Sequence, residues 1–225
     1  MIPILRTHLG RRDPFSFSCM RCLQCCREKK IQVNPYEIAR LAGNLGISTT
    51  EFIARYTLEQ GAYLKFNDNG ICVFLDHKGC GVHKDRPLVC RLYPIGRQVN
   101  EMGDEWFLEL QPEAACNGRY GRTATIEDFL EDQGATAYML AADGYLTLLW
   151  EMMEIMDCMS AKMEIRDAAD VSVEKENALV EYAEWMDMDA AVRKYCQENK
   201  IIFPDKVEDK MHVHIDALRL WINQP

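Results

Sequence analysis

The sequence lacks the features that mark exported, membrane-spanning and duplex-binding proteins. Its most apolar long stretch, residues 138–156, is interrupted by Asp143, Glu151 and Glu154, so it predicts no membrane span. Residues 1–12 have neither the apolar core nor the small-residue cleavage site of a signal peptide, which predicts a cytoplasmic protein. The formal net charge is -9, and a binder of DNA or RNA needs clustered Lys and Arg. We therefore expect neither a membrane nor a nucleic acid as a partner.

Internal repeats and low-complexity stretches are also absent, and the composition is that of a globular protein. The chain has 225 residues, of which 48% are hydrophobic and 27% charged, so it can bury a core without covalent staples. Proline and glycine become rare beyond Gly121, and residues 126–225 hold most of the acidic side chains. This change of character predicts a cysteine-cluster metal-binding domain over 1–122 and an acidic helical subdomain over 123–225.

Cysteine is what the sequence has in excess. Eight of the ten cysteines lie in the first 116 residues, and four fall within eight consecutive positions. A disulfide framework would suit a secreted protein, whereas thiols of a cytosolic chain stay reduced and commonly bind metal. We therefore expect metal ligands among the eight. They are Cys19, Cys22, Cys25, Cys26, Cys72, Cys80, Cys90 and Cys116.

The spacing favours iron–sulfur chemistry over zinc. Cys19, Cys22 and Cys25 repeat the Cys-x2-Cys-x2-Cys run with which ferredoxins supply three ligands, the fourth coming from a remote cysteine. Eight thiols divide into two sets of four, which predicts one or two 4Fe-4S clusters. Zinc is the alternative, because thiolates also bind zinc and Cys80-x2-His83 is a step that zinc accepts. His83 is itself expected to be no ligand.

The adjacent pair Cys25 and Cys26 carries a more specific prediction. Their Cα atoms are about 3.8 Å apart across a trans peptide. In an extended conformation their side chains would point to opposite faces of the chain. We therefore predict that they serve two different metal centres. Cys158 and Cys196 stand alone in predicted helices, and we expect both to be buried thiols outside the metal sites.

The order of these motifs resembles a known family. Cys19-x2-Cys22-x2-Cys25-Cys26 is followed by Cys72-Val-Phe-Leu, by Cys80-Gly-Val-His-x2-Arg-Pro-x2-Cys90-Arg-x-Tyr-Pro and by Cys116-Asn-Gly. Over about the first 120 residues this is similar to the CxxCxxCC cysteine-cluster family of zinc- or iron-chelating domains. A related cluster occurs in flagellin lysine N-methylases, although no S-adenosylmethionine loop is recognisable here. The resemblance implies a metal site and leaves the reaction open.

The expected fold is mainly α with small β-hairpins, an α+β protein with an irregular cysteine-rich region and a helical C-terminal part. Asn34 and Ser48 or Thr49 are expected to cap a helix pair ending near Tyr56. That pair resembles a DNA-binding helix-turn-helix but lacks basic residues, so we expect a packing role. Hairpins are predicted over 63–75 and 95–110, with Cys80 and Cys90 on loops. Further helices are expected over 126–133, 135–163, 172–185, 187–199 and 207–223.

Two functions remain open from the sequence. The first is an iron–sulfur protein in electron transfer or serving as the redox part of a modifying enzyme, with a redox or protein partner. The second is a zinc-stabilised protein-interaction module without catalysis. Arg86 and Arg91 could supply positive charge beside a cluster or tie loops together by hydrogen bonds. No catalytic residue can be assigned by spacing, and His212 and His214 are expected at the surface.

Overall fold

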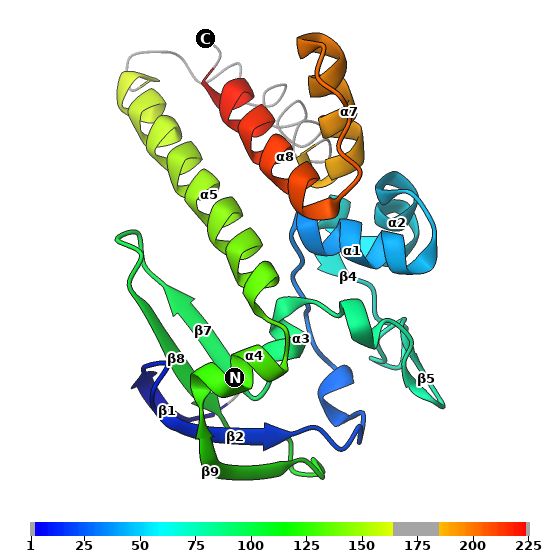
Figure 1. The fold of residues 1–225 in the computed structure, drawn as a ribbon, viewed down its shortest axis with the longest axis vertical. Helices are drawn as coiled ribbons and strands as arrows, with labels where there is room; N and C mark the ends of the chain where they lie inside the picture. Colours follow the sequence, from blue (N-terminus) through cyan, green and yellow to red (C-terminus); the bar gives the residue numbers. More distant parts are fainter. Residues whose placement is uncertain (1–2, 164–184, 224–225) are drawn as a thin grey trace. The chain divides into compact units, whose positions relative to one another are not determined.

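The computed structural model describes residues 3–163 and 185–223, with side chains in the long helix described as far as Ile155. It is a mixed α+β structure of helices and small antiparallel strand pairs, as predicted (Figure 1). Packing divides the chain into two units, which we name by content. The cysteine unit comprises residues 1–32 and 63–140, and the helical unit comprises residues 33–62 and 141–225.

The sequence placed the domain boundary at a single point, between residues 122 and 123, and that division stays a prediction about folding units. In the structure the chain leaves the cysteine unit after Gln32 and returns at Tyr63. These two residues form an isolated antiparallel bridge, and the Leu64 amide donates to the carbonyl of Ile31 at 2.9 Å. The excursion between them therefore begins and ends at one paired point of the cysteine unit.

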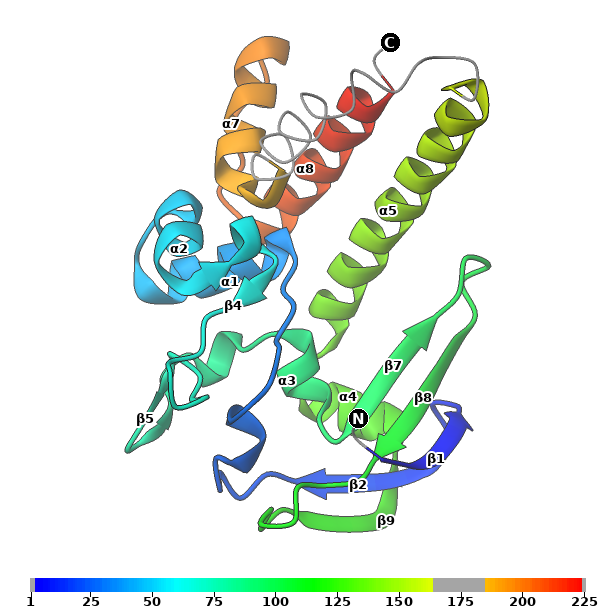
Figure 2. The same ribbon diagram turned by 180° about the vertical axis from the view of Figure 1, so that it is seen from behind.

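Short strands make up much of the cysteine unit. One sheet has the order β1-β8-β7, and β2 pairs with β9 and β5 with β6, all antiparallel (Figure 2). The strands of this unit are β1 (Ile4–Leu9), β2 (Pro14–Ser18), β4 (Tyr63–Leu64), β5 (Leu75–Asp76), β6 (Gly79–Cys80), β7 (Ile95–Val99), β8 (Glu105–Leu110) and β9 (Arg119–Thr125).

The predicted second hairpin is confirmed as β7 and β8, closed by a turn in which Asn100 N–H donates to the carbonyl of Asp104. The predicted first hairpin is much shorter than expected. Its turn forms, because Asn67 accepts from the backbone amides of Asn69 and Ile71, but Cys72 takes part only in a single bridge with Phe66. Cys72 therefore lies on irregular backbone.

The helices of the cysteine unit are short. They are η1 (Gln24–Cys26), η3 (His83–Asp85), α3 (Leu88–Leu92), α4 (Ile126–Asp132) and the start of α5 (Thr136–Met163). The predicted capping box opens α4, since Thr125 accepts from the Asp128 amide while the Asp128 carboxylate accepts from the Thr125 amide. Phe15, Phe107 and Ile126 are almost fully buried and belong to the core that holds the strands and α4 together.

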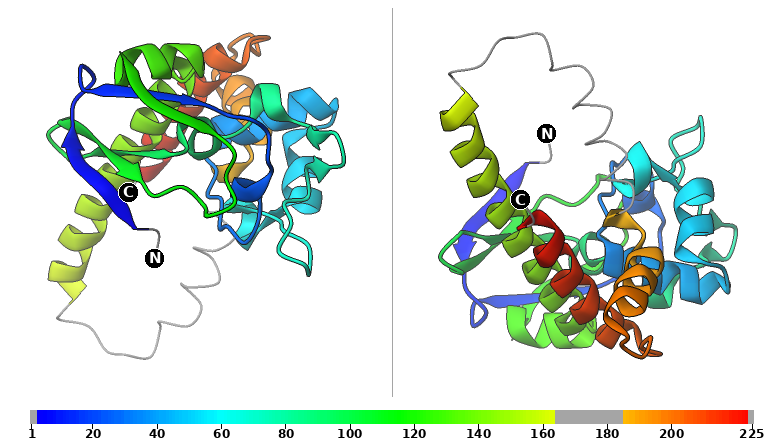
Figure 3. Two further views of the ribbon diagram at one scale, coloured as in Figure 1. Left: turned by 90° about the horizontal axis from the view of Figure 1, so that it is seen from below. Right: turned by 90° about the horizontal axis from the view of Figure 1, so that it is seen from above.

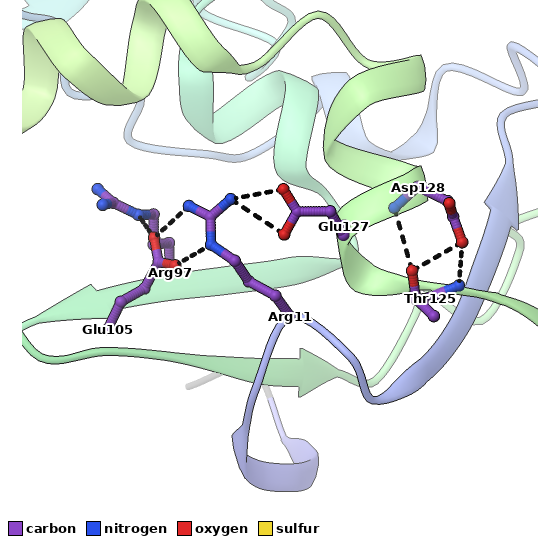
Figure 4. A network of polar contacts seen from close by, with 6 residues as sticks. All are labelled: Arg11, Arg97, Glu105, Thr125, Glu127 and Asp128. Carbon is purple, nitrogen blue, oxygen red and sulfur yellow. Dashed lines mark hydrogen bonds and ion pairs between the residues drawn. The ribbon is translucent and has the colours of Figure 1, made fainter.

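A network of charged side chains ties this framework together at the surface (Figure 4). Arg11, between β1 and β2, pairs with Glu105 of β8 at 2.6 Å and with Glu127 of α4 at 3.0 Å. Arg97 of β7 also pairs with Glu105, and these two guanidinium groups lower the pKa of that carboxylate against the effect of its burial. Arginines of this region thus have carboxylate partners.

The helical unit contains the predicted helix pair and the C-terminal helices, of which α7 and α8 lie side by side (Figure 3). Asn34 caps the first helix with a capping box and Ser48 caps the second, as the sequence predicted. The first helix packs against α7 and α8 and the second packs against α7, which agrees with the expected packing role. The elements are α1 (Pro35–Leu45), α2 (Thr49–Tyr56), β3 (Thr57–Leu58), η2 (Glu59–Gly61), the rest of α5, α7 (Met188–Asn199) and α8 (Val207–Ile222).

One histidine departs from expectation. His214 was expected at the surface but is fully buried in the helical unit, where its Nδ1 lies 2.9 Å from the hydroxyl of Tyr145. Its Nε2 has no hydrogen-bond partner among the described residues. The register of α8 explains the error, because its buried face also carries Met211 and Leu218. The predicted helix over 172–185 lies outside the described residues except for Trp185.

Candidate metal centre

Strand pairing brings the first and last of the clustered cysteines to the same place. Ser18 of β2 pairs with Arg119 of β9; Cys19 directly follows β2, and Cys116 lies three residues before β9. The two cysteines are 97 positions apart in sequence, so their approach depends on this pairing and not on local spacing.

A second backbone contact places Cys72 beside the N-terminal cluster. The Cys72 amide donates to the carbonyl of Cys26 at 3.2 Å, and the next pair outward, Arg27 and Ile71, forms an antiparallel bridge. Cys80 follows closely, because β6 folds back on β5 with Cys80 opposite Leu75. The turn that precedes Cys72 thus returns the chain to η1. This is where a remote cysteine must lie if it is to share a metal centre with the N-terminal cysteines.

Cys80 and Cys90 were predicted on loops, and the structure corrects both: Cys80 ends the short strand β6, and Cys90 lies within the five-residue helix α3. The Cys90 amide donates to the carbonyl of Pro87 at 3.0 Å. Pro87 precedes the first helical residue and Tyr93-Pro94 follows the last. The two prolines therefore bound a short helix around Cys90.

Cys25 and Cys26 do not have the extended conformation assumed in the sequence argument. They lie in η1, and their sulfurs are 4.0 Å apart. The argument from opposite faces therefore does not apply to this segment. Contact with Cys26 lowers the pKa of Cys25 to about 7, whereas contact with Cys25 and burial raise the pKa of Cys26. Within the pair, Cys25 is the thiol that ionises first.

A recurrent hydrogen bond is directed at the sulfurs of these cysteines. The amide of Arg21 lies 3.4 Å from the sulfur of Cys19, and the amide of Gly118 lies 3.4 Å from that of Cys116, each two residues further along. The same spacing joins three further pairs in the described part of the chain. These are Gln24 with Cys22, Phe74 with Cys72 and Val82 with Cys80. A backbone N–H aimed at sulfur stabilises the thiolate, which is the ligand form.

Burial acts against these amides. It raises the pKa of Cys72 and Cys80, although their amide contacts offset part of the effect. At Cys22 the balance is reversed: burial opposes the thiolate, but the amides of Gln24 and Asn117 and the thiol of Cys116 outweigh it and lower the pKa. Buried thiols with directed amides gain most from a positive partner such as a metal.

All eight predicted cysteines line one cavity of the cysteine unit, with a volume of about 750 Å³. Their sulfurs form a soft donor set, which is typical of zinc and iron–sulfur sites. In residues 3–163 and 185–223 as they stand, no three Cys, His, Asp or Glu side chains are gathered closely enough to hold a single ion. The structure therefore brings the predicted residues around a common space, and their role as ligands stays a prediction.

Arg91 and Tyr93 fasten the loops around this cavity. The buried guanidinium of Arg91 donates to the carbonyls of Arg86, Gln133 and Lys84, and it lies over the ring of Tyr138. The hydroxyl of Tyr93 accepts from the Glu113 amide. For Arg91 the loop-tying role is thus observed.

Sequence reasoning missed Tyr120, whose hydroxyl lies 3.3 Å from the sulfur of Cys116. No local pattern marked this residue, because its position depends on the pairing of β9 with β2. Burial and Cys116 raise the pKa of this tyrosine. Tyr120 thus remains a neutral hydroxyl at the edge of the candidate centre.

The remaining cysteines lie elsewhere. Cys196 is buried in α7 of the helical unit, as expected, and its sulfur lies 3.9 Å from the carbonyl of Ile202. The side chain of Cys158 lies outside the described residues. No helix in the part of the chain that the structure covers is both long and apolar enough to cross a bilayer.

These features are typical of a cysteine-cluster domain. Residues 18–116 match the model of the CxxCxxCC family, described as a "putative zinc- or iron-chelating domain", which is the family that the motifs indicated. An uncharacterised protein of Methanocaldococcus jannaschii is 33% identical over 122 residues, which is 50% of this chain and 63% of the relative. The chain thus spans less than two thirds of that relative. No solved structure matches.

Proposed function

We propose that the eight cysteines bind iron–sulfur clusters of the 4Fe-4S type, and that the protein acts in electron transfer or as the redox part of a modifying enzyme. The observation that carries this proposal is the repeated amide-to-sulfur contact around one cavity lined by all eight thiols. Hydrogen bonds to sulfur are a principal means by which proteins hold a cluster and set its reduction potential. When bound, such a cluster accepts and releases single electrons.

Iron is favoured over zinc by the spacing and by the room available. Cys19, Cys22 and Cys25 form the ferredoxin-like triplet, and the cavity of about 750 Å³ is within the range of sites that hold a whole ligand. A structural zinc ion needs four ligands at about 2.3 Å in a closed tetrahedron. Eight thiols around a cavity of this volume fit iron–sulfur clusters better than a single zinc ion.

Contacts among the thiols favour one division into two sets, in which Cys25 also interacts with Cys26 and Cys80 of the other set and Cys19 is assigned by its spacing alone. Cys26 interacts with Cys80 and Cys90, Cys72 interacts with Cys80, and the backbones of Cys26 and Cys72 are hydrogen-bonded. These four would form one set. Cys22 contacts Cys116, and with Cys19 and Cys25 they would form the other. Cys25 and Cys26 would then still serve two different centres. The reason would be that the two centres lie close together, and not that the two side chains point to opposite faces of a strand.

Anaerobic purification followed by visible absorption and counts of iron, sulfide and zinc tests the proposal. We expect a brown protein with about four irons and four sulfides per cluster. A colourless protein with stoichiometric zinc and no sulfide would overturn it and support the zinc-stabilised interaction module. Reduction by dithionite should bleach the visible band, because the cluster takes up an electron.

A further inference from the structure

Beside the thiol cavity lies a second hollow of about 490 Å³, lined by Cys19, Arg21, His83, Arg86, Arg91 and residues 131–134. Three arginines thus meet at one hollow of a chain whose net charge is -9. The two hollows share Cys19, Arg21, His83, Arg86 and Gln133 as walls, so whatever occupies one is next to the other.

None of these three guanidinium groups has a carboxylate within ion-pair distance among the described residues. Elsewhere in the cysteine unit arginines are paired, as Arg6 is with Glu109 and Arg11 with Glu105. Glu131 and Asp132 line the hollow, but neither pairs with an arginine in the part of the chain that the structure covers. The two carboxylates offset part of the charge of the three guanidinium groups without pairing with any of them, so the lining keeps a positive excess.

Arg86 is the best placed of the three to bind a ligand. Its Nη1 donates to the carbonyl of His83 at 2.6 Å and its Nη2 donates to Oε1 of Gln133 at 2.7 Å. A guanidinium has five N–H donors in a fixed plane, so donors remain for a further acceptor. Burial and the neighbouring charge of Arg91 lower the pKa of Arg86, and the thiols of Cys90, Cys19 and Cys80 act against this.

Arg91 has a different task. Its donors are taken by three backbone carbonyls, and it lies over the Tyr138 ring at 3.9 Å. Arg91 thereby joins the segment 84–86 to Gln133. This holds Gln133 and the residues next to His83 in place, and Gln133 and His83 are the acceptors of the Arg86 guanidinium. The Arg86 plane is thus held in place before any ligand binds, which reduces the entropy lost on binding.

We propose that this hollow is an oxyanion subsite, in which Arg86 and Arg21 bind the carboxylate or phosphate group of a small substrate beside the thiol cavity. Arginine recognises both groups by paired N–H donors in its plane. The subsite deepens the proposed function, because it would hold the substrate of a redox enzyme next to its centre. Its anion binding does not depend on which metal the cysteines hold.

Calorimetric titration of the purified, metal-loaded protein with inorganic phosphate and separately with succinate tests the subsite. We expect saturable binding of at least one probe, and at least a tenfold loss of affinity in Arg86→Gln and in Arg21→Gln. Arg86→Lys should bind with intermediate affinity, because lysine keeps the charge and loses the planar pair of donors. Preference between the two probes tells a phosphate from a carboxylate ligand.

Arg12→Gln is the matched control, because Arg12 is an exposed arginine of the same unit outside the hollow, and it should bind both probes as the wild type does. Absence of binding to the wild type, or equal affinity in Arg86→Gln and Arg21→Gln, would overturn the subsite. So would a loss of metal in Arg86→Gln with unchanged anion affinity, which would make Arg86 a counter-charge for the centre. Since Arg21 is exposed, its variant remains informative if Arg86→Gln folds poorly. Iron and zinc counts on the same samples separate failure of the subsite from failure of the proposed cluster.

Discussion

Substitutions at Cys25 and Cys26 test how many metal centres the protein has. If the two sets proposed above are right, Cys26→Ser and Cys72→Ser should lose the same centre, and Cys25→Ser and Cys116→Ser should lose the other. Iron should fall by about half in each variant, because a 4Fe-4S cluster with a missing thiolate is not held securely. Iron counting and electron paramagnetic resonance of the reduced proteins measure this. Loss of one and the same signal in all four variants would show that a single centre uses both adjacent thiols.

Cys196 provides a contrasting case at the same scale. It is a buried thiol of the helical unit and lies outside the thiol cavity, so Cys196→Ser should retain the full metal content of the wild type. Cys158→Ser is expected to do the same. Cys90→Ser, which changes a cavity thiol, is the positive control and should lose metal. Loss of iron from folded Cys196→Ser protein would contradict the assignment.

His214 predicts how stability changes with pH. Burial lowers its pKa to about 3, whereas an unfolded histidine has a pKa near 6.5. Below pH 6.5 the unfolded chain therefore takes up a proton that the folded chain excludes. The free energy of unfolding should fall as pH decreases from about 6.5 towards 3, by at most about 1.4 kcal/mol per pH unit from this group.

Urea unfolding between pH 7 and pH 5 measures this contribution. His214→Gln should lower overall stability, since it changes a fully buried side chain, but it should also flatten the pH dependence by up to one proton. His212→Gln is the control, because His212 is exposed on the same helix and should leave the slope near that of the wild type. An unchanged slope in His214→Gln would show that other groups cause the acid sensitivity.

At the scale of single elements, the start of α4 should be sensitive to its cap. Thr125→Ala removes the hydroxyl that accepts from the Asp128 amide, which should cost about 1 kcal/mol of stability. Thr147→Ala changes an exposed threonine inside α5 and should have little effect or stabilise slightly, because alanine is the better helix former. Denaturant midpoints compare the two variants, and equal effects would contradict the capping argument.

Elements whose information is local were predictable, and elements that depend on distant partners were not. Asn34, Ser48 and Thr125 mark helix starts because the cap contacts residues only three positions away. Nothing in Ile4–Leu9 or Arg119–Thr125 marks a strand by itself, because each is defined by a partner that is remote in sequence. Long-range pairing, which local sequence patterns do not encode, accounts for these missed strands.

The candidate site shows the same division. The identity of the eight cavity cysteines followed from their spacing, since soft thiols at short intervals have few uses besides metal binding. The conformation of Cys25 and Cys26 did not follow, because η1 depends on Leu23 in a left-handed conformation just before it. The three arginines of the second hollow were also missed as a group, because Arg21 and Arg86 come from separate loops.

For the molecule as a whole, the acidic residues of the C-terminal part contribute to packing and ion pairs within the helical unit. In the helical unit α1 packs against α7 and α8 and α2 packs against α7, and the described side chains include ion pairs such as Arg40 with Glu208 and Arg219 with Glu151. Part of the acidity is therefore used in pairing within the unit. The helix pair that resembled a DNA-binding motif has packing surfaces on both of its helices.

The discontinuous path of the cysteine unit has a consequence for biosynthesis. Its thiols lie on both sides of the excursion over residues 33–62, and the last of them, Cys116, reaches the cavity only when β9 pairs with β2. A ribosome adds roughly 5–20 residues per second, so seconds pass between synthesis of the first cysteine and of the last. The nascent chain thus exposes reactive thiols before their cavity exists, and insertion of a metal must follow translation or be assisted while it proceeds.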